Sequence, residues 1–151
     1  MLNVGKICSR DVDLAQSDES VHDLAKRMLT RRVGTLVVVD DEHHPTGIVT
    51  DRDLVLRVLA TAKDPETAWA RDVVTSPVHV VHENGSLEDA VRTMRAERCR
   101  RLVVVGAGGK LVGIVSLDDV LAILAEQMRG VAALLESEAP HALEGELKLG
   151  C

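Results

Sequence analysis

The hydrophobic positions of this chain alternate between strand-like and helix-like spacings, and the whole alternation occurs twice. Apolar residues recur at the i, i+3, i+4, i+7 spacing of an amphipathic helix from Val21 to Met28, and again from Leu87 to Met94. A short extended segment precedes each helix, and two β-branched runs and a second apolar helix follow it. The expected strands cover residues 12–14, 36–39, 46–50, 78–81, 102–105 and 111–115. This order, β-α-β-β-α repeated, predicts an α+β fold.

The two copies align without a gap at a constant separation of 66 positions. The matching pairs include Ser20 with Ser86, Met28 with Met94, Leu36 with Leu102, and Gly47 with Gly113. One unit is too small to bury a good core, so we expect the two copies to pack against each other about a pseudo-two-fold axis. The chain then divides into repeat 1 (1–61), a linker and lead-in (62–69), repeat 2 (70–128), and a helical extension with a C-terminal tail (129–151).

The second helix of each copy is expected to bury one apolar side. Its residues are Leu54, Val55, Val58 and Leu59 in repeat 1, and Val120, Leu121 and Leu124 in repeat 2. Beyond Met128 the apolar pattern continues through Val131, Leu134 and Leu135 and breaks at Pro140. Such a face is compatible with self-association and with packing on the protein's own core, and the pattern leaves both open.

Composition narrows the classes of partner. The net charge of −6 argues against a nucleic-acid polymer, because phosphate backbones attract basic surfaces. With one Trp and no Tyr or Phe, a bound heterocycle would lie between aliphatic side chains rather than on aromatic rings. No apolar run is long enough to span a membrane and no secretion signal is evident, so we expect a cytoplasmic protein. Cys8, Cys99 and Cys151 show no metal-type spacing, so reduced thiols and no metal site are expected. No cofactor is expected either.

The most informative motif occurs once per copy, at Gly47-Ile48-Val49-Thr50-Asp51-Arg52-Asp53 and at Gly113-Ile114-Val115-Ser116-Leu117-Asp118-Asp119. Each begins with a glycine and has a hydroxyl at the end of a strand and a carboxylate three residues later in a helix. The spacing fits a capping box in which the hydroxyl and the carboxylate satisfy the helix start. It equally fits a ligand site, because a helix N-terminus favours phosphate, a carboxylate can accept from ribose hydroxyls, and glycine permits close approach. The spacing alone leaves both readings open.

These segments resemble the ligand signature of cystathionine-β-synthase (CBS) domains, and the resemblance covers both copies to about Met128. It implies that Asp53 with Thr50, and Asp119 with Ser116, hold ribose or phosphate. It also implies that Gly47 and Gly113 belong to the ligand site and that backbone around Val12 and Val78 borders the adenine. A homodimer is expected because the family commonly forms one. The TDRDL segment and the linker also resemble small bacterial two-CBS proteins linked to stress or hypoxia.

Basic residues distinguish the second copy. The segment from Arg100 onward is similar to a repeat of the nucleotide-sensing subunit of AMP-activated kinase, where basic residues before this strand reach phosphates. We therefore expect Arg100 and Arg101 to contact phosphate. We interpret Arg92, Arg95 and Arg98 as helix residues that complement the C-terminal helix dipole. The first copy has Gly34 and Thr35 in place of Arg100 and Arg101, which puts phosphate binding there in doubt.

The functional hypothesis is a regulatory module that binds an adenosine-containing nucleotide (AMP, ADP, ATP or an adenosyl compound) in the clefts between the repeats. The alternative is a structural or interaction protein with unoccupied clefts that acts through dimerisation. Catalysis is not expected, because each cleft would hold one carboxylate rather than an acid–base pair. The downstream protein partner is not identified by the sequence.

Overall fold

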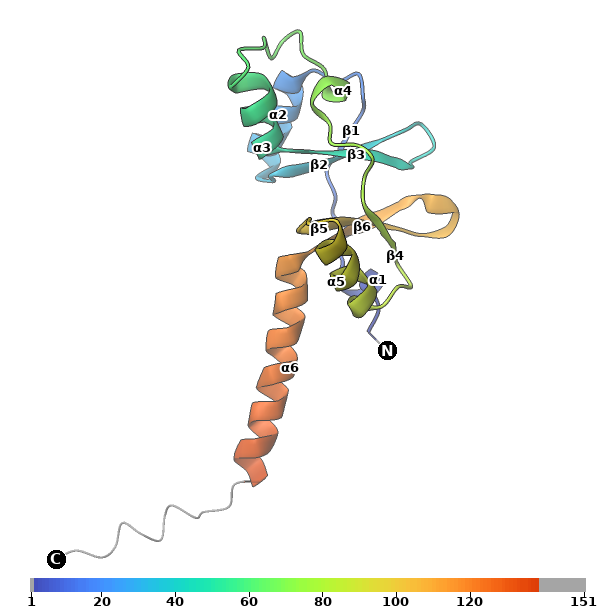
Figure 1. Ribbon diagram of the computed structural model, residues 1–151, viewed down its shortest axis with the longest axis vertical. Coiled ribbons are helices and arrows are strands. Elements are labelled where there is room, and N and C mark those ends of the chain that lie inside the picture. Colours follow the sequence, from blue (N-terminus) through green and yellow to red (C-terminus); the bar gives the residue numbers. More distant parts are fainter. Residues whose placement is uncertain (1, 139–151) are drawn as a thin grey trace, which may run out of the picture.

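The computed structural model describes residues 2–138, which form two equivalent three-stranded sheets with helices around them (Figure 1). The first sheet has the order β1-β2-β3, with β1 parallel and β3 antiparallel to β2, and the second has the same order β4-β5-β6. The strands are β1 (Leu14–Ala15), β2 (Thr35–Val39), β3 (Pro45–Thr50), β4 (Val80–His82), β5 (Arg101–Val105) and β6 (Leu111–Ser116). The predicted α+β fold and the repeated strand order are confirmed, although β1 and β4 begin two residues later than expected.

Helices complete each repeat, as the hydrophobic spacing predicts. They are α1 (Val4–Ile7), α2 (Val21–Arg31), α3 (Asp51–Leu54), the π-helical turn η1 (Val55–Leu59), α4 (Ala70–Val73), α5 (Leu87–Ala96), the 3-10 turn η2 (Ala107–Gly109) and α6 (Leu117–Glu138). The side chains of Ser20 and Ser86 cap α2 and α5 by accepting from the N–H groups of Asp23 and Asp89. The glycine-rich segment 106–109 forms the connection of the β5–β6 hairpin.

The central strand of each sheet is buried on both faces. In β2, Leu36 and Val38 face the core beneath α2, while Val37 and Val39 join Val103 and Val105 of β5 in a third apolar cluster between the sheets. The two sheets therefore pack face to face, and each repeat buries apolar surface that it could not bury alone.

The segments that lead into the two repeats are exchanged. Helix α1, at the start of the first sequence copy, packs on the second repeat: Val4 is part of that repeat's core, and its N–H donates to the carbonyl of Gly85 (2.9 Å). Helix α4, at the start of the second copy, packs on the first repeat, where Ala70 and Val73 are fully buried. The two packed units therefore each combine residues from both sequence copies.

The expected burial of the second helices is wrong at four of the seven positions. Val58 and Val120 are buried and Leu54 packs against the first core, but Val55, Leu59, Leu121 and Leu124 are 51%, 76%, 53% and 45% exposed. Helix α6 leaves the body after its first turns and projects well beyond it (Figure 1). The predicted break at Pro140 lies outside the described residues. Within residues 2–138, no helix combines the length and hydrophobicity needed to cross a membrane.

Candidate functional site

Strand β3 brings Thr50 to the start of α3, where the hydroxyl and Asp53 form a complete capping box. One carboxylate oxygen, Asp53 Oδ2, accepts from the Thr50 N–H (2.8 Å) and hydroxyl (2.9 Å), and the Asp53 N–H donates to Thr50 Oγ1 (3.2 Å). Ser116 and Asp119 repeat this arrangement at the start of α6. The other oxygen, Asp53 Oδ1, lies 3.5 Å from the guanidinium of Arg57. Capping therefore occupies one oxygen and leaves Asp53 able to accept from a ligand with the other.

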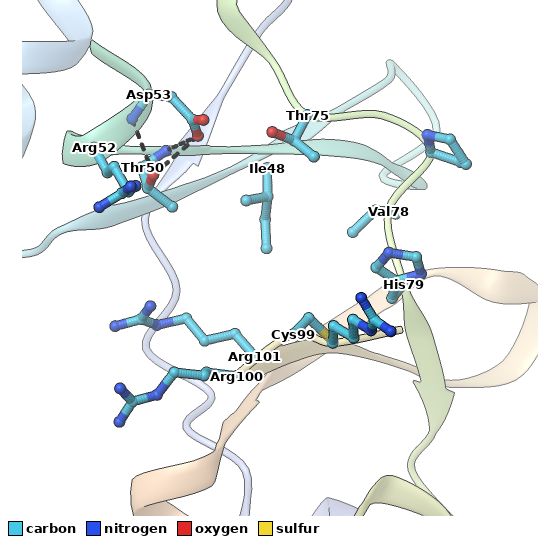
Figure 2. A pocket seen from close by; sticks show the side chains of 12 residues that line it. Ile48, Thr50, Arg52, Asp53, Thr75, Val78, His79, Cys99, Arg100 and Arg101 are labelled. Carbon is cyan, nitrogen blue, oxygen red and sulfur yellow. Dashed lines mark hydrogen bonds between the residues drawn. The ribbon is translucent and has the colours of Figure 1, made fainter. Parts of the chain in front are cut away.

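Thr50 and Asp53 line a cavity with a volume of about 400 Å³. Its upper wall in Figure 2 comes from the end of β3 and the start of α3, and its lower wall comes from the segment before β5. We call it the arginine cleft. Its lining residues are Ile48, Thr50, Arg52, Asp53, Thr75, Pro77, Val78, His79, Arg98, Cys99, Arg100 and Arg101. The predicted residues Thr50, Asp53, Val78, Arg100 and Arg101 are thus brought together in one place.

The arginine cleft carries a strong excess of positive charge. Arg52, Arg98 and Arg101 form no ion pair within residues 2–138, and Arg100 meets the exposed Asp118 at 3.6 Å. Figure 2 shows Arg52 on the upper wall and Arg100 and Arg101 on the lower wall, all three on the same side of the opening. Asp53 is the one carboxylate among the residues that line the cleft. Guanidinium groups arranged in this way suit an anion with several charged oxygens.

The interpretation of Arg98 as a helix residue is wrong. Helix α5 ends at Ala96, and Arg98 adopts a left-handed conformation (φ 51°) that carries the chain around toward β5. Arg98 thereby lines the cleft. Arg92 does lie on α5, where it pairs with Glu88 (3.0 Å) and Asp89 (3.4 Å), and Arg95 lies in the last turn of that helix.

A smaller cavity of about 230 Å³, which we call the second cleft, occupies the pseudo-symmetric position. Its lining residues are Ser9, Asp11, Val12, Asp13, Val33, Gly34, Thr35, Arg101 and Ile114. Val12 lies here, as Val78 lies in the arginine cleft, but Ser116 and Asp119 are not among its lining residues. Arg98, Arg100 and Arg101 of the second copy therefore line the same cavity as Thr50 and Asp53 of the first copy, and Arg101 lines the second cleft as well.

The two motif glycines accommodate the exchanged lead-in segments. A Cβ on Gly47 would lie 2.2 Å from Val74 Cγ2 and 2.9 Å from the carbonyl of Thr75. A Cβ on Gly113 would lie 2.5 Å from the carbonyl of Ser9. Ile48 pairs with Thr75, and Ile114 with Ser9, in short antiparallel bridges. The close approach that these glycines permit is therefore an approach of the protein's own backbone, and neither glycine lines a cleft.

Besides Arg98, the sequence reasoning missed six residues that line the cleft: Ile48, Arg52, Thr75, Pro77, His79 and Cys99. Arg52 stands between the hydroxyl and the carboxylate of the motif, so its place at the helix start could have been noticed. His79 and Cys99 carry no local signal, because the fold alone brings them to the cavity. Burial raises the pKa of the Cys99 thiol above its ordinary value. Among the described residues, no group of three or more His, Cys, Asp or Glu side chains is arranged to hold a metal ion.

Comparison with known proteins identifies the family. The CBS domain profile matches residues 4–60 and 70–126, so the chain belongs to the CBS-domain family. It is 32% identical over 147 residues to the uncharacterized protein YlbB of Bacillus subtilis, a match that covers 96% of this chain and 98% of that protein. It is 36% identical over 122 residues to the uncharacterized protein MK0525 of Methanopyrus kandleri, covering 81% of this chain but 62% of that longer relative.

Solved structures show the same fold. The crystal structure of Hypoxic Response Protein I with two coordinated zinc ions has a TM-score of 0.72 and 28% identity, and the match covers 80% of this chain and 98% of that one. A relative of this name, Hypoxic response protein 1, comes from Mycobacterium tuberculosis. The CBS domain pair of protein MJ0100, solved in complex with 5-methylthioadenosine and S-adenosyl-L-methionine, has a TM-score of 0.74 and 24% identity, covering 84% of this chain and 98% of that one. This chain is thus a tandem CBS pair.

Proposed function

We propose that this protein is a regulatory module that binds a phosphorylated adenosine nucleotide in the arginine cleft. The observation that carries the proposal is the convergence of Asp53 with four arginines on one cavity. Its volume of about 400 Å³ falls in the range of roughly 300–1,000 Å³ typical of small-molecule sites. The MJ0100 domain pair, which shares the fold, was solved with two adenosyl compounds bound, and this supports the adenosine part of the proposal.

The lining residues suit the three parts of such a nucleotide. Ile48 and Val78 offer an aliphatic surface to the base, in a chain whose single aromatic residue, Trp69, lies elsewhere. Asp53 accepts from the ribose hydroxyls through its Oδ1 atom, while Oδ2 keeps the helix cap. Arg100 and Arg101 bind phosphate oxygens through charge-assisted hydrogen bonds, and Arg52 meets the same group from the opposite wall. The ligand would therefore bridge the two repeats.

The same site does not offer the paired carboxylates of an acid–base mechanism, and we propose that it binds its ligand without chemistry. Asp53 is the one carboxylate that lines the arginine cleft, and no second carboxylate lining it could share acid–base work. The four arginines would stabilise charge in the bound ligand itself. Regulation would follow if occupancy changes how the protein presents itself to a partner. We further propose that the protein acts as a homodimer, because large apolar side chains on η1 and α6 are exposed in the single chain.

The test measures the affinities of phosphorylated and unphosphorylated ligands for two double variants, one in the cleft and one outside it. Arg100→Ala/Arg101→Ala should weaken ATP or AMP at least tenfold, because each well-formed bond to a charged group contributes about 1.5–3 kcal/mol. Adenosine should lose little. The measurement is calorimetric titration, with the ligand-induced rise in melting temperature as a second readout. A charge-matched control is Arg92→Ala/Arg95→Ala, which removes two arginines of α5 that do not line the cleft. Wild-type affinity of the Arg100/Arg101 variant for every phosphorylated ligand would overturn the proposal.

A further inference from the structure

One arginine lines both clefts. Arg101, the first residue of β5, borders the arginine cleft and also the second cleft. In the arginine cleft it stands with Arg52, Arg98 and Arg100, whereas it is the one arginine among the described residues that line the second cleft. Arg101 is exposed, and within residues 2–138 its side chain forms no ion pair and no hydrogen bond. Its guanidinium is therefore available to either cavity.

The pseudo-symmetric position in repeat 1 holds Thr35, which stands 66 positions earlier, at the start of β2. Thr35 pairs with Thr50 across the β2–β3 ladder, as Arg101 pairs with Ser116 across the β5–β6 ladder. Thr35 lines the second cleft alone, whereas Arg101 lines both clefts. The two backbone positions are equivalent, so the longer side chain of arginine is what extends its reach to two cavities.

Without Arg101, the charged groups of the second cleft would repel an anion. Asp11 and Asp13 line this cleft. Arg31 pairs with both of them, at 3.1 Å and 2.8 Å, and so offsets one of their two negative charges, but it does not itself line the cavity. Gly34 stands in the position that Arg100 has in the arginine cleft. A phosphorylated ligand in the second cleft would therefore depend on Arg101.

We propose that Arg101 limits each chain to one phosphorylated nucleotide. The inference rests on the proposed function, that is, on a phosphorylated nucleotide in the arginine cleft. The phosphate there takes the Arg101 guanidinium through charge-assisted hydrogen bonds. The second cleft then keeps Asp11 and Asp13 and loses its arginine, so a second phosphorylated nucleotide binds at least about tenfold more weakly. The coupling is reciprocal: an anion in the second cleft weakens binding in the arginine cleft by the same factor.

Calorimetric titration with ATP measures the number of sites. The wild-type protein should bind one ATP per chain. Thr35→Arg should bind a second, because each cleft then has its own arginine at this position and Arg101 is no longer shared. The fold already accommodates arginine at the equivalent place in repeat 2, and circular dichroism checks that the variant is folded. The matched control is Thr30→Arg, which adds the same charge at an exposed position of α2 that lines neither cleft and should keep one site.

A thiol in each cleft shows which cavity is filled. Cys99 lines the arginine cleft, and Ser9→Cys in a Cys8→Ser background places another thiol in the second cleft. At ten times its dissociation constant, ATP should slow the alkylation of Cys99 about tenfold and that of the introduced thiol by less than about twofold. With Thr35→Arg added, ATP should protect both thiols. The comparison without Thr35→Arg does not depend on the folding of that variant.

The outcomes separate this inference from the proposed function. Two ATP molecules bound per wild-type chain with similar affinities, or equal protection of both thiols, would overturn the limit set by Arg101 and leave nucleotide binding intact. A single site in a folded Thr35→Arg protein would show that sharing of Arg101 is not what excludes the second nucleotide, and would also overturn the inference. A wild-type protein that binds no phosphorylated adenosine ligand would instead overturn the proposed function itself.

Discussion

The two clefts have equivalent backbones and opposite chemistry. Each cleft lies beside the end of one strand, a lead-in segment, and the residues that precede a central strand. The residues of one cleft stand 66 positions from their counterparts in the other. Where the arginine cleft has His79, Arg100 and Arg101, the second cleft has Asp13, Gly34 and Thr35. Asp13 in turn is held by the guanidinium of Arg31 (2.8 Å). The second cleft therefore offers no comparable cluster of arginines to a polyphosphate.

The comparison of the two clefts distinguishes residues that both repeats need for folding from residues that serve ligand binding. The capping boxes, the motif glycines and the lead-in bridges occur in both repeats, because both repeats need them to fold. The residues that differ between the clefts, His79, Arg100 and Arg101 in one and Asp13, Gly34 and Thr35 in the other, belong to none of the apolar core clusters, so packing does not fix their identity. A framework residue and its pseudo-symmetric counterpart should therefore respond alike to substitution, and a cleft residue and its counterpart should not.

The largest expected effect concerns the equivalent core residues Leu36 and Leu102, both fully buried. Leu36→Ala and Leu102→Ala should each lower the free energy of unfolding by about 2–5 kcal/mol, because each leaves a cavity. The exchanged lead-in segments tie each core to the other copy, so either variant should unfold in one transition that involves both repeats. Urea denaturation followed by far-UV circular dichroism and by Trp69 fluorescence measures this.

Trp69 lies beside α4 on the first repeat, so its fluorescence reports chiefly on that repeat. Coincident transitions by both probes in the Leu102→Ala variant would support coupled repeats. Separate transitions, with fluorescence unchanged while half of the dichroism is lost, would show that the repeats unfold independently. The conservative variants Leu36→Met and Leu102→Met serve as controls and should cost less than about 1.5 kcal/mol.

The next effect concerns the motif glycines. Gly47→Ala and Gly113→Ala should each destabilise the protein by about 1–3 kcal/mol, because the new methyl group overlaps the lead-in segment of the other copy. Gly130→Ala is the control, since a Cβ there meets nothing within 4 Å and the position is helical. Thermal unfolding measures all three. Neutral behaviour of Gly47→Ala would mean that the lead-in segment is not held against β3 in solution.

The repeat pattern predicted the framework closely. Strands β2, β3, β5 and β6 lie within one residue of the expected ranges, since β-branched runs and the glycine-initiated motif mark them locally. The exchange of α1 and α4 could not be predicted, because contacts between distant segments, such as Val4 with Gly85 and Ala70 with Glu19, leave no periodic trace in the sequence. The exposure of Val55 and Leu121 was missed because an apolar stripe looks the same whether it faces a core or a partner. The arginines were recognised, but their pairing with Asp53 depends on how the copies face each other.

A smaller effect should distinguish the two capping carboxylates. Asp53→Asn and Asp119→Asn both keep an oxygen that can accept from the cap N–H but lose a negative charge near a helix start, which costs about 0.3–1 kcal/mol of stability in each case. Only Asp53→Asn should weaken adenosine nucleotides, by about tenfold, because a charged acceptor for the ribose hydroxyls is replaced by a neutral one. Calorimetric titration with ATP and with adenosine measures this. Equal weakening by Asp119→Asn would place ribose in both clefts.

The last prediction requires no destabilising substitution. It uses the alkylation rates of Cys8 and Cys99 to report where the nucleotide binds. Cys99 lines the arginine cleft, whereas Cys8 packs against the core of the second repeat. Burial raises the pKa of both thiols, so each stays protonated to higher pH than a free thiol, and alkylation should speed up as rising pH increases the thiolate fraction. A nucleotide in the arginine cleft should shield Cys99. At ten times its dissociation constant it should slow Cys99 alkylation about tenfold, in proportion to the unoccupied fraction, and leave Cys8 unaffected.

Peptide mass spectrometry resolves the two sites from each other and from Cys151. Arg100→Ala/Arg101→Ala should abolish the protection at the same nucleotide concentration. Protection of Cys8 in place of Cys99 would move the ligand out of the arginine cleft.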